Sequence, residues 1–289
     1  MDHPDWLPPR PTLRPGIRVV RRDDEHLQVG IDPGLRVVLP DDLAVHDLLA
    51  DLRVGRRPAT DVPDVRRWCH ALADRDLLVD AGELAHTLSG PIPRPAVLAS
   101  FAEHGGGAAG RLRLRSRSRV QVVADEPWRQ PTLRLLAASG ITVATDGAGA
   151  TLVVTAAGEA RRDDLDSWMR DGTPHLVVRN RGGRVVVGPF VAPGLTACLR
   201  CVDAHACDDD PGHALVLEQH AAPAEEPCDP VLMHLAVAWA VRDLVTYVDG
   251  DCPASWSATA TLGLGLPDVR SWTRHPRCGC AWGDVLAVG

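Results

Sequence analysis

Short β-rich runs separated by polar turns dominate the start of the chain. Residues 17–20, 27–31 and 35–39 predict three strands, divided by a charged turn at 22–25 and an Asp-Pro-Gly turn at 32–34. Apolar residues at helical spacing then predict two helices, at 41–52 and 64–72, with Asp41 or Asp42 capping the first and Asp64 the second. A short strand at 77–79 follows. The pattern indicates a strand-strand-strand-helix-helix module within residues 1–90.

Residues 91–118 read as a linker, because Pro, Gly and Ala are frequent and only a short piece near 97–104 has a helical pattern. The run 111–120 alternates arginine with other residues. It indicates a solvated edge leading into a strand rather than a nucleic-acid patch, since no aromatic residues are interleaved.

From residue 119 the pattern changes to that of an α/β domain. Strands are expected at 120–123, 141–144, 152–154, 175–178 and 184–187, with helices at 132–139 and 163–170. Strands alternating with helices predict a parallel sheet covered on both faces. A last helix, at 229–248, is apolar on most sides, so we expect it to be deeply buried or to form a dimer interface.

Composition supports an ordinary globular protein of about two domains. The 289 residues are 45% hydrophobic and carry a formal net charge of −7, which gives no reason to expect nucleic acid or an anionic membrane as partner. The N-terminal MDHPDWLPPR is not a secretory signal. The longest apolar stretch, 231–241, is about half of the roughly 20 residues that span a bilayer. We therefore expect a soluble cytoplasmic protein. The sequence contains no lysine, which excludes a lysine Schiff base and a phosphate-binding lysine.

Two close cysteine pairs are spaced like the ligands of a metal ion. Cys198 and Cys201 form a CxxC, and Cys278 and Cys280 flank a glycine near the C-terminus. Two such pairs predict a tetrahedral four-thiolate zinc site of structural type. The alternatives are buried unligated cysteines and a redox CxxC, but the first pair follows Pro193 and Gly194 in an expected loop, whereas redox motifs open a helix.

Other possible ligands are present, but they form no recognisable catalytic set. These are Cys207, Cys228, Cys252, His205 and His275. Because no HExxH or comparable motif occurs, we expect no second, catalytic zinc ion.

The stretches 188–205 (GPFVAPGLTACLRCVDAH) and 275–280 (HPRCGC) resemble the ThiF-like proteins of azole- and azoline-containing ribosomal peptide pathways, known as cyclodehydratase partner or leader-peptide-binding proteins. The element order from Leu152 to Cys201 is also similar to that of the wider ThiF/MoeB adenylyltransferase fold. The resemblance covers about residues 15–280. It implies an N-terminal winged-helix, PqqD-like recognition module (1–90), a linker (91–118), and a degenerate Rossmann-type ThiF-like domain (119–289) with the four-cysteine zinc site.

The resemblance also implies a place for a peptide. In PqqD-like elements a precursor's leader peptide adds as a strand to a sheet edge beside the last helix, a form of β-augmentation. The residues matched to this groove are Leu35, Arg36, Val37, Val38 and Leu39 on the edge and Arg66, Arg67 and His70 on the helix. The two arginines would suit an acidic leader, although arginines on a solvated helix face are common.

Active ThiF-like enzymes use features that this chain lacks. The first strand of the α/β domain runs into Ala124, Asp125, Glu126 and Pro127 without the glycine that lets a backbone approach a phosphate. Asp146 could replace the ribose-binding carboxylate or simply belong to a turn, and the segment after 152–154 lacks the catalytic aspartate. We therefore expect no bound ATP.

These inferences predict a non-catalytic, homodimeric partner protein. It would bind the leader of a ribosomally synthesised precursor peptide and present it to a separate YcaO-type ATP-dependent cyclodehydratase, which would act in trans because the chain ends at Gly289. The alternative is an ATP-dependent adenylating enzyme that acts on a peptide carboxylate. A third hypothesis is an interaction protein that has kept the fold and lost the groove.

Overall fold

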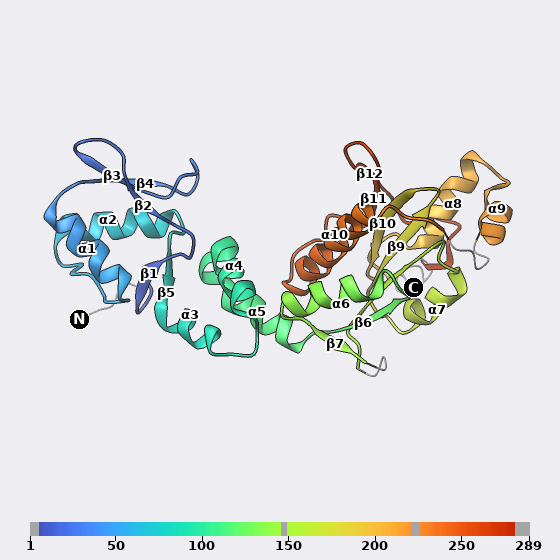
Figure 1. Cartoon of the computed structure of the whole chain (residues 1–289), viewed down its shortest axis with the longest axis horizontal. Coiled ribbons are helices and arrows are strands. Elements are labelled where there is room, and N and C mark those ends of the chain that lie inside the picture. Colours follow the sequence, from blue (N-terminus) through green and yellow to red (C-terminus); the bar gives the residue numbers. More distant parts are fainter. Residues whose placement is uncertain (1–5, 146–148, 221–225, 281–289) are drawn as a thin grey trace, which may run out of the picture. The chain divides into compact units, whose positions relative to one another are not determined.

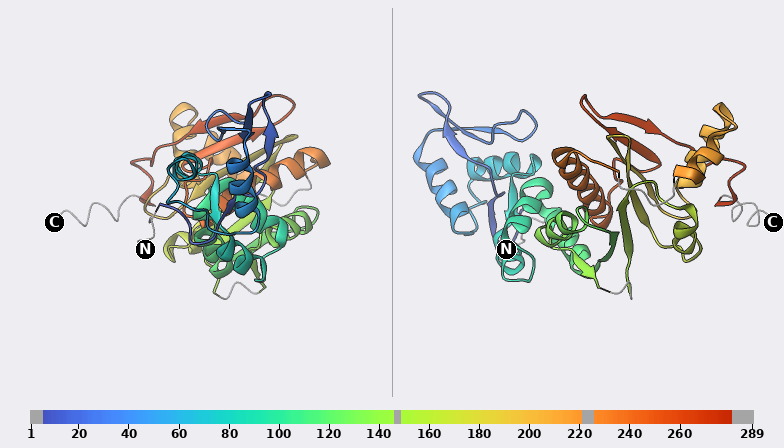
Figure 2. Two further views of the ribbon diagram at one scale, coloured as in Figure 1. Left: turned by 90° about the vertical axis from the view of Figure 1, so that its left-hand side faces the viewer. Right: turned by 45° about the vertical axis from the view of Figure 1, so that its right-hand side comes forward.

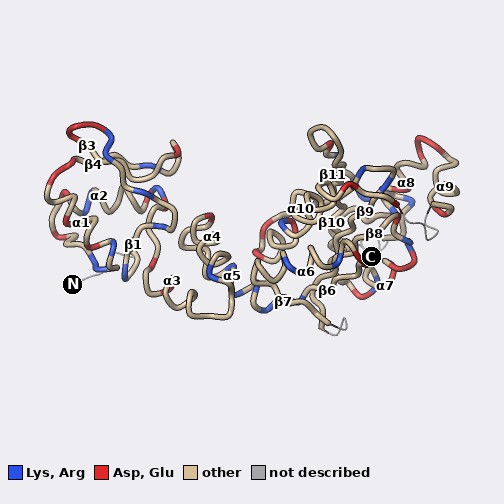
Figure 3. The backbone as a smooth tube through the Cα atoms, viewed as in Figure 1, with Lys and Arg blue, Asp and Glu red and all other residues tan. Residues whose placement is uncertain are grey.

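The computed structural model describes residues 6–145, 149–220 and 226–280. The chain divides into two compact units, Met1–Arg113 (unit 1) and Leu114–Gly289 (unit 2), shown in blue to green and in green to red in Figure 1. Acidic and basic positions are interspersed along the backbone of each unit (Figure 3).

Unit 1 contains the three expected strands as an antiparallel sheet. The strands are β2 (Val19–Arg21), β3 (His26–Val29) and β4 (Val37–Pro40), in the order β2-β3-β4. The helices α1 (Leu43–Arg53) and α2 (Pro63–Asp74) follow, and their apolar faces share one core with the sheet. Asp42 caps α1 by accepting a 2.9 Å hydrogen bond from the Val45 N–H. The cap predicted for α2 was wrong: Val62 is its N-cap, and Asp64 lies in its first turn after Pro63.

Helices fill much of the segment that the sequence indicated to be a linker. β1 (Pro11–Leu13), which the sequence analysis missed, pairs with β5 (Leu78–Asp80). After β5 come α3 (Ala81–Leu88), α4 (Arg94–His104), the 3-10 turn η1 (Gly105–Gly107) and α5 (Ala108–Arg117). The strand-like interpretation of 111–120 was therefore wrong. Leu112 is buried with Phe101 in a second core, and this packing overrides the local alternation.

Unit 2 is built on a seven-stranded sheet in the order β12-β11-β10-β9-β8-β6-β7. The strands β6 to β9 are parallel, and β10 to β12 continue the sheet antiparallel. Their bounds are β6 (Arg119–Ala124), β7 (Thr142–Ala144), β8 (Leu152–Ala157), β9 (His175–Arg181), β10 (Arg184–Val191), β11 (Ala258–Leu262) and β12 (Asp268–Ser271). The predicted parallel sheet is thus a mixed one.

Helices cover both faces of this sheet (Figure 2). On one face α6 (Arg129–Ala138) and α10 (Pro230–Val248) pack on the strands and share the largest core. On the other, α7 (Arg162–Arg170) and α8 (Leu199–Asp209) enclose Leu165, Val177 and Leu199. The short α9 (His213–His220) follows α8.

α10 is the one described helix that is long and apolar enough to cross a membrane, but half of its most apolar stretch is buried inside the protein. Core helices of soluble proteins show the same pattern. Asp229 caps the helix by accepting a hydrogen bond from the Leu232 N–H. At the other end, Asp249 receives two hydrogen bonds from the Arg115 guanidinium at 2.5 and 2.6 Å, with both side chains buried.

The strand order of unit 2 contains a switch point. From β6 the chain runs by α6 to β7 on one side, and β8 then pairs with β6 on the other side. In open α/β sheets, ligands bind outside the carboxyl ends of the strands at such a point. Here those ends lead into the loop that begins at Asp125 and into Gly158 and Glu159.

Candidate functional site

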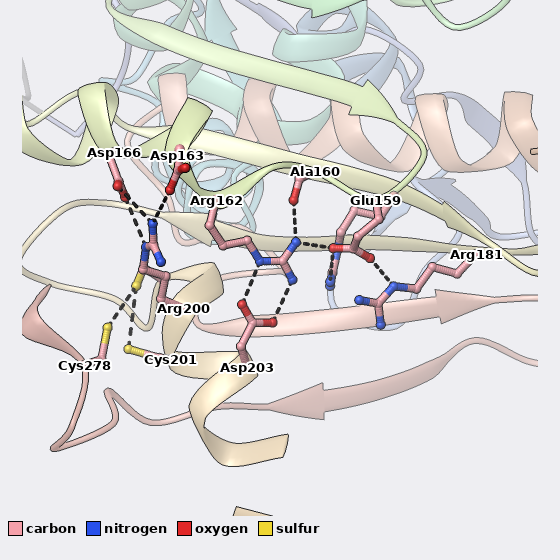
Figure 4. A network of polar contacts seen from close by, with 12 residues as sticks. Glu159, Ala160, Arg162, Asp163, Asp166, Arg181, Arg200, Cys201, Asp203 and Cys278 are labelled. Carbon is pink, nitrogen blue, oxygen red and sulfur yellow. Dashed lines mark hydrogen bonds and ion pairs between the residues drawn. The ribbon is translucent and has the colours of Figure 1, made fainter. Parts of the chain in front are cut away.

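The four predicted cysteines converge at one place in unit 2. Cys198 and Cys201 lie at the start of α8, and Cys278 and Cys280 lie in the segment after β12. Their sulfur atoms all lie within 4.8 Å of one another, and three of the four side chains are buried. The Sγ atoms of Cys198 and Cys201 are 3.7 Å apart, those of Cys198 and Cys278 3.6 Å, and those of Cys201 and Cys280 3.3 Å. Figure 4 shows part of the cluster.

These separations fit a tetrahedral metal ion better than disulfides. Zinc–sulfur bonds of about 2.3 Å place the four sulfurs of a tetrahedral site roughly 3.8 Å apart. A disulfide needs a separation of about 2.05 Å, and all four cysteines are free. The donor set and its spacing therefore suit a closed, structural Zn²⁺ site that would fasten the 275–280 segment to α8.

The reason given for excluding a redox CxxC was wrong. Cys198 is the N-cap of α8 and Cys201 lies in its first turn, so the motif does open a helix after a strand. The second cysteine pair distinguishes the two chemistries, because four mutually adjacent sulfurs make a metal site. Among the thiols, hydrogen bonds from Cys198 and Cys280 lower the pKa of Cys201, while the bond with Cys201 raises the pKa of Cys198.

A second group of possible ligands, His205, Asp208 and His275, has ligand atoms within 4.8 Å of one another. The Arg277 N–H donates a 3.1 Å hydrogen bond to His275 Nδ1, which assigns the proton to Nε2. Nε2 then donates to Asp208 at 2.9 Å. Because Nε2 is already the donor in this tautomer, the group is a hydrogen-bonded clamp on the loop that carries Cys278.

A buried charge cluster that the sequence analysis missed lies close by (Figure 4). The carboxylate of Glu159, with no exposed side-chain surface, forms ion pairs with Arg162, Arg179 and Arg181. Arg162 also donates two 2.7 Å hydrogen bonds to Asp203 on α8. Two signals were available in the sequence: an acidic residue, Glu159, two positions after the end of an apolar strand, and two arginines at the end of the apolar run of β9.

The cluster predicts a pH dependence of stability. Burial alone would raise the pKa of Glu159, but Arg179, Arg181 and Arg162 outweigh burial, so the pKa is lowered from its ordinary 4.5. The unfolded chain therefore binds the proton more readily than the folded chain, and Glu159 stabilises the fold above its ordinary pKa. We expect the stability difference between the wild type and Glu159→Gln to shrink as the pH falls from about 5 to 3. Urea denaturation across this range measures it, and a constant difference would contradict the assignment.

The predicted peptide edge lies in unit 1. β4 begins at Val37, so Leu35 and Arg36 precede the strand. The Asp41 N–H bonds to Glu25, and the register pairs Val38 with Gln28. Because hydrogen-bonded and non-hydrogen-bonded pairs alternate, the N–H and C=O of Val38 point away from β3. Val37 and Leu39 are buried and Val38 is exposed. Among the described residues, no strand pairs with this edge.

The helix expected beside that edge is α2, which packs against β4. Arg66 and Arg67 are exposed, and Arg67 forms a 3.0 Å ion pair with Asp64 on the same helix. His70 is half-buried and stacks on Trp6, with the ring centroids 3.5 Å apart. The structure thus leaves the two arginines at the surface and covers part of the histidine.

At the switch point of unit 2, the loop after β6 places exposed Asp125 and Glu126 beside buried Trp128. Asp146, considered above as a ribose-binding residue, lies outside the described residues. After β8 the chain passes through Gly158 into the buried Glu159. Neither loop carries the glycine-rich turn that would bring backbone N–H groups to a phosphate.

Comparison with solved structures identifies similar folds. The heterocyclase TruD matches with a TM-score of 0.72 and 17% identity over 94% of this chain and 42% of that one. A heterocyclase in complex with substrate and cofactor matches with a TM-score of 0.66 and 17% identity, over 91% and 38% of the two chains. E. coli MccB with ATP matches with a TM-score of 0.61 and 13% identity, over 94% and 99%. No protein-family model and no curated protein sequence matches the chain.

At these identities the comparisons establish the fold, which is the ThiF-like fold that TruD and MccB share. The chain spans less than half the length of the two heterocyclases it matches. The expectation of a ThiF-like α/β fold is confirmed, and a four-cysteine cluster is present as predicted. The PqqD-like identity of unit 1 stays a prediction.

Proposed function

We propose that this chain is a non-catalytic partner protein that binds the leader of a ribosomally synthesised precursor peptide. It would present the peptide to a separate YcaO-type, ATP-dependent cyclodehydratase in the cytoplasm. The observation that carries the proposal is the outer edge of β4 beside α2, which no strand among the described residues pairs with, in a fold similar over 94% of the chain to that of a heterocyclase. Unit 1 would act as the PqqD-like recognition module, and the zinc-braced α/β domain would dock the enzyme.

The edge of β4 suits strand addition. Because Val37 and Leu39 are buried in the core of unit 1, an added peptide strand would not disturb their packing. The backbone groups of Val38 would supply hydrogen bonds to the peptide, while exposed Arg66 and Arg67 would favour acidic side chains. Each exposed charge pair would contribute only about 0.2–1 kcal/mol, so the backbone bonds would dominate.

Proline at Val38 tests this edge. Proline removes the outward N–H but no bond to β3, so the sheet should remain intact. We expect Val38→Pro to raise the Kd for a fluorescently labelled leader peptide at least tenfold, about 1.4 kcal/mol.

Val19→Pro is the matched control, because the register of β2 with β3 points the Val19 N–H to the opposite edge of the same sheet. It should leave the Kd unchanged. Equal Kd values for Val38→Pro and Val19→Pro, with circular dichroism showing both variants folded, would exclude the β4 edge as the peptide site.

The second candidate is an adenylating enzyme that acts on a peptide carboxylate. The match to MccB with ATP, which covers nearly the full length of both chains, is the observation that favours it. Against it stand the glycine-free loop at Asp125 and Glu126 and the absence of lysine from the chain. ATP–pyrophosphate exchange by the purified chain with a leader peptide would support this candidate, and we expect none.

We extend the proposal to a homodimer formed through α10. Its exposed side includes Val231 and Leu235, which are 77% and 50% exposed. Burying these side chains against a second copy would remove apolar surface from water. Light scattering that gave the mass of one chain at micromolar concentration would contradict the dimer.

A further inference from the structure

Glu159 lies where this fold class binds external ligands. It lies two residues after the end of β8, and Arg179 and Arg181 lie at the carboxyl end of the neighbouring strand β9. Ligands of open α/β sheets bind at this edge, next to the switch point. Clustered arginines are also the side chains that proteins use to hold phosphate oxygens, by charge-assisted and often bidentate hydrogen bonds.

The carboxylate of Glu159 occupies the position that an external anion would take among these arginines. One of its oxygens contacts Arg162 and the other contacts Arg181 (Figure 4). The first oxygen also contacts Arg179, and the Glu159 side chain has no exposed surface. Three guanidinium groups thus surround one carboxylate supplied by the chain itself. A buried charge of this kind is tolerated only when it is paired.

The cluster is richer in donors than its own carboxylates can satisfy. It contains three guanidinium groups, from Arg162, Arg179 and Arg181, against the two carboxylates of Glu159 and Asp203. The buried Nε of Arg179 has no hydrogen-bond partner among the described residues. Burial, which Glu159 only partly offsets, lowers the pKa of Arg179 to about 10, so it remains charged near neutral pH. A tetrahedral oxyanion has more acceptor oxygens than a carboxylate and would suit this surplus.

A surface cavity borders the cluster on the side of Arg162 and Asp203. The cavity, of about 660 Å³, is also lined by Arg161, Arg200 and Arg277. An inorganic phosphate ion is much smaller than this cavity. The arginines along the cavity would also attract an anion toward the cluster.

We propose that Arg162, Arg179 and Arg181 form a phosphate site that the protein fills with its own Glu159 carboxylate. The ligand class is inorganic phosphate or the phosphate groups of diphosphate, and removing the Glu159 carboxylate opens the site to it. In the wild type the site is closed, so this edge of the sheet holds an internal anion in place of an external one. The proposal does not depend on peptide binding by unit 1.

The test compares Glu159→Ala with the wild type by thermal unfolding in sodium phosphate and in sodium chloride of equal ionic strength. Phosphate at about 100 times its Kd should raise the midpoint of Glu159→Ala by roughly 5–11 °C over chloride. The wild type should show no difference between the two salts. Glu218→Ala removes an exposed carboxylate from the same cavity and should behave as the wild type does. Adding Arg181→Ala to Glu159→Ala should abolish the phosphate effect.

Each outcome decides the proposal. If Glu159→Ala folds and responds equally to both salts, the cluster is purely structural and the proposal is wrong. If the wild type responds to phosphate as strongly as the variant, Glu159 does not fill the site. If Glu159→Ala fails to fold in chloride, its refolding yield in phosphate is the readout, and equal yields in both salts would overturn the proposal. Glu159→Gln keeps the shape but not the charge, so it should lose stability and gain little from phosphate.

Discussion

Replacing Cys201 by alanine is expected to abolish stoichiometric zinc binding and to destabilise unit 2 by at least about 4 kcal/mol. A ligand present at about 1,000 times its Kd stabilises the folded state by roughly that amount, and structural zinc sites bind more tightly still. Cys201 is fully buried and its sulfur lies 3.7 Å from that of Cys198 and 3.3 Å from that of Cys280. Three remaining thiolates cannot close a four-coordinate site. For a domain of 150–250 residues, the loss corresponds to a fall in Tm of roughly 8–16 °C.

Metal analysis by mass spectrometry and thermal unfolding with and without a zinc chelator measure this effect. The wild type should contain one zinc ion per chain and lose its stability advantage in chelator, whereas Cys201→Ala should be insensitive to chelator. Cys252→Ser is the matched control, because Cys252 is an exposed free cysteine outside the cluster. If the wild type contains no zinc after expression in zinc-supplemented medium, the four cysteines do not form a zinc site.

Replacing Arg115 by alanine is expected to cost about 3–5 kcal/mol of stability, because the buried Asp249 carboxylate loses its guanidinium partner. The Asp249 side chain is 3% exposed. It also lies at the C-cap of α10, where the partial negative charge of the helix end makes a carboxylate unfavourable without a cation beside it. The Arg115 guanidinium is a cation of this kind, and it donates hydrogen bonds of 2.5 and 2.6 Å to the Asp249 carboxylate.

Arg113→Ala is the control for this variant. Arg113 lies on the same helix but is 65% exposed, so its loss should change stability by no more than about 0.5 kcal/mol. Urea denaturation measures both variants. Adding Asp249→Ala to Arg115→Ala should restore part of the stability, because it removes the buried carboxylate that Arg115 no longer pairs with. A change below about 1 kcal/mol for Arg115→Ala would show that the buried pair does not secure the end of α10.

The sequence predicted best where the local pattern and the tertiary packing agree. The strands of the first module, the helices α1, α6, α7 and α10 and the parallel part of the large sheet all have apolar spacing that matches their observed burial. The four cysteines were predictable because thiol pairs at close spacing have few other uses, and their convergence follows from the sheet order.

The failures have identifiable physical causes. The arginine-rich run before β6 alternates like a strand, yet burial of Leu112 makes it helical as α5. β11 and β12 were missed, since β11 pairs with β10, which lies far away in the sequence, and β12 pairs in turn with β11. The Glu159 cluster depends on three segments meeting in space, around Glu159, β9 and α8, and no spacing within any one segment encodes it. In all three cases, contacts between segments far apart in the sequence determine the structure, and the local pattern of residues does not contain that information.

The most direct test of the central claim, that this protein captures a leader peptide, is a fluorescence polarisation titration with the full, zinc-loaded chain. The labelled probes are synthetic peptides encoded by the small open reading frames that flank the gene. We expect one of them to bind with a Kd of about 1 µM or tighter, a binding free energy of about −8 kcal/mol. If no flanking peptide binds, the zinc site and the ThiF-like fold are unaffected, but the proposed scaffold function is wrong.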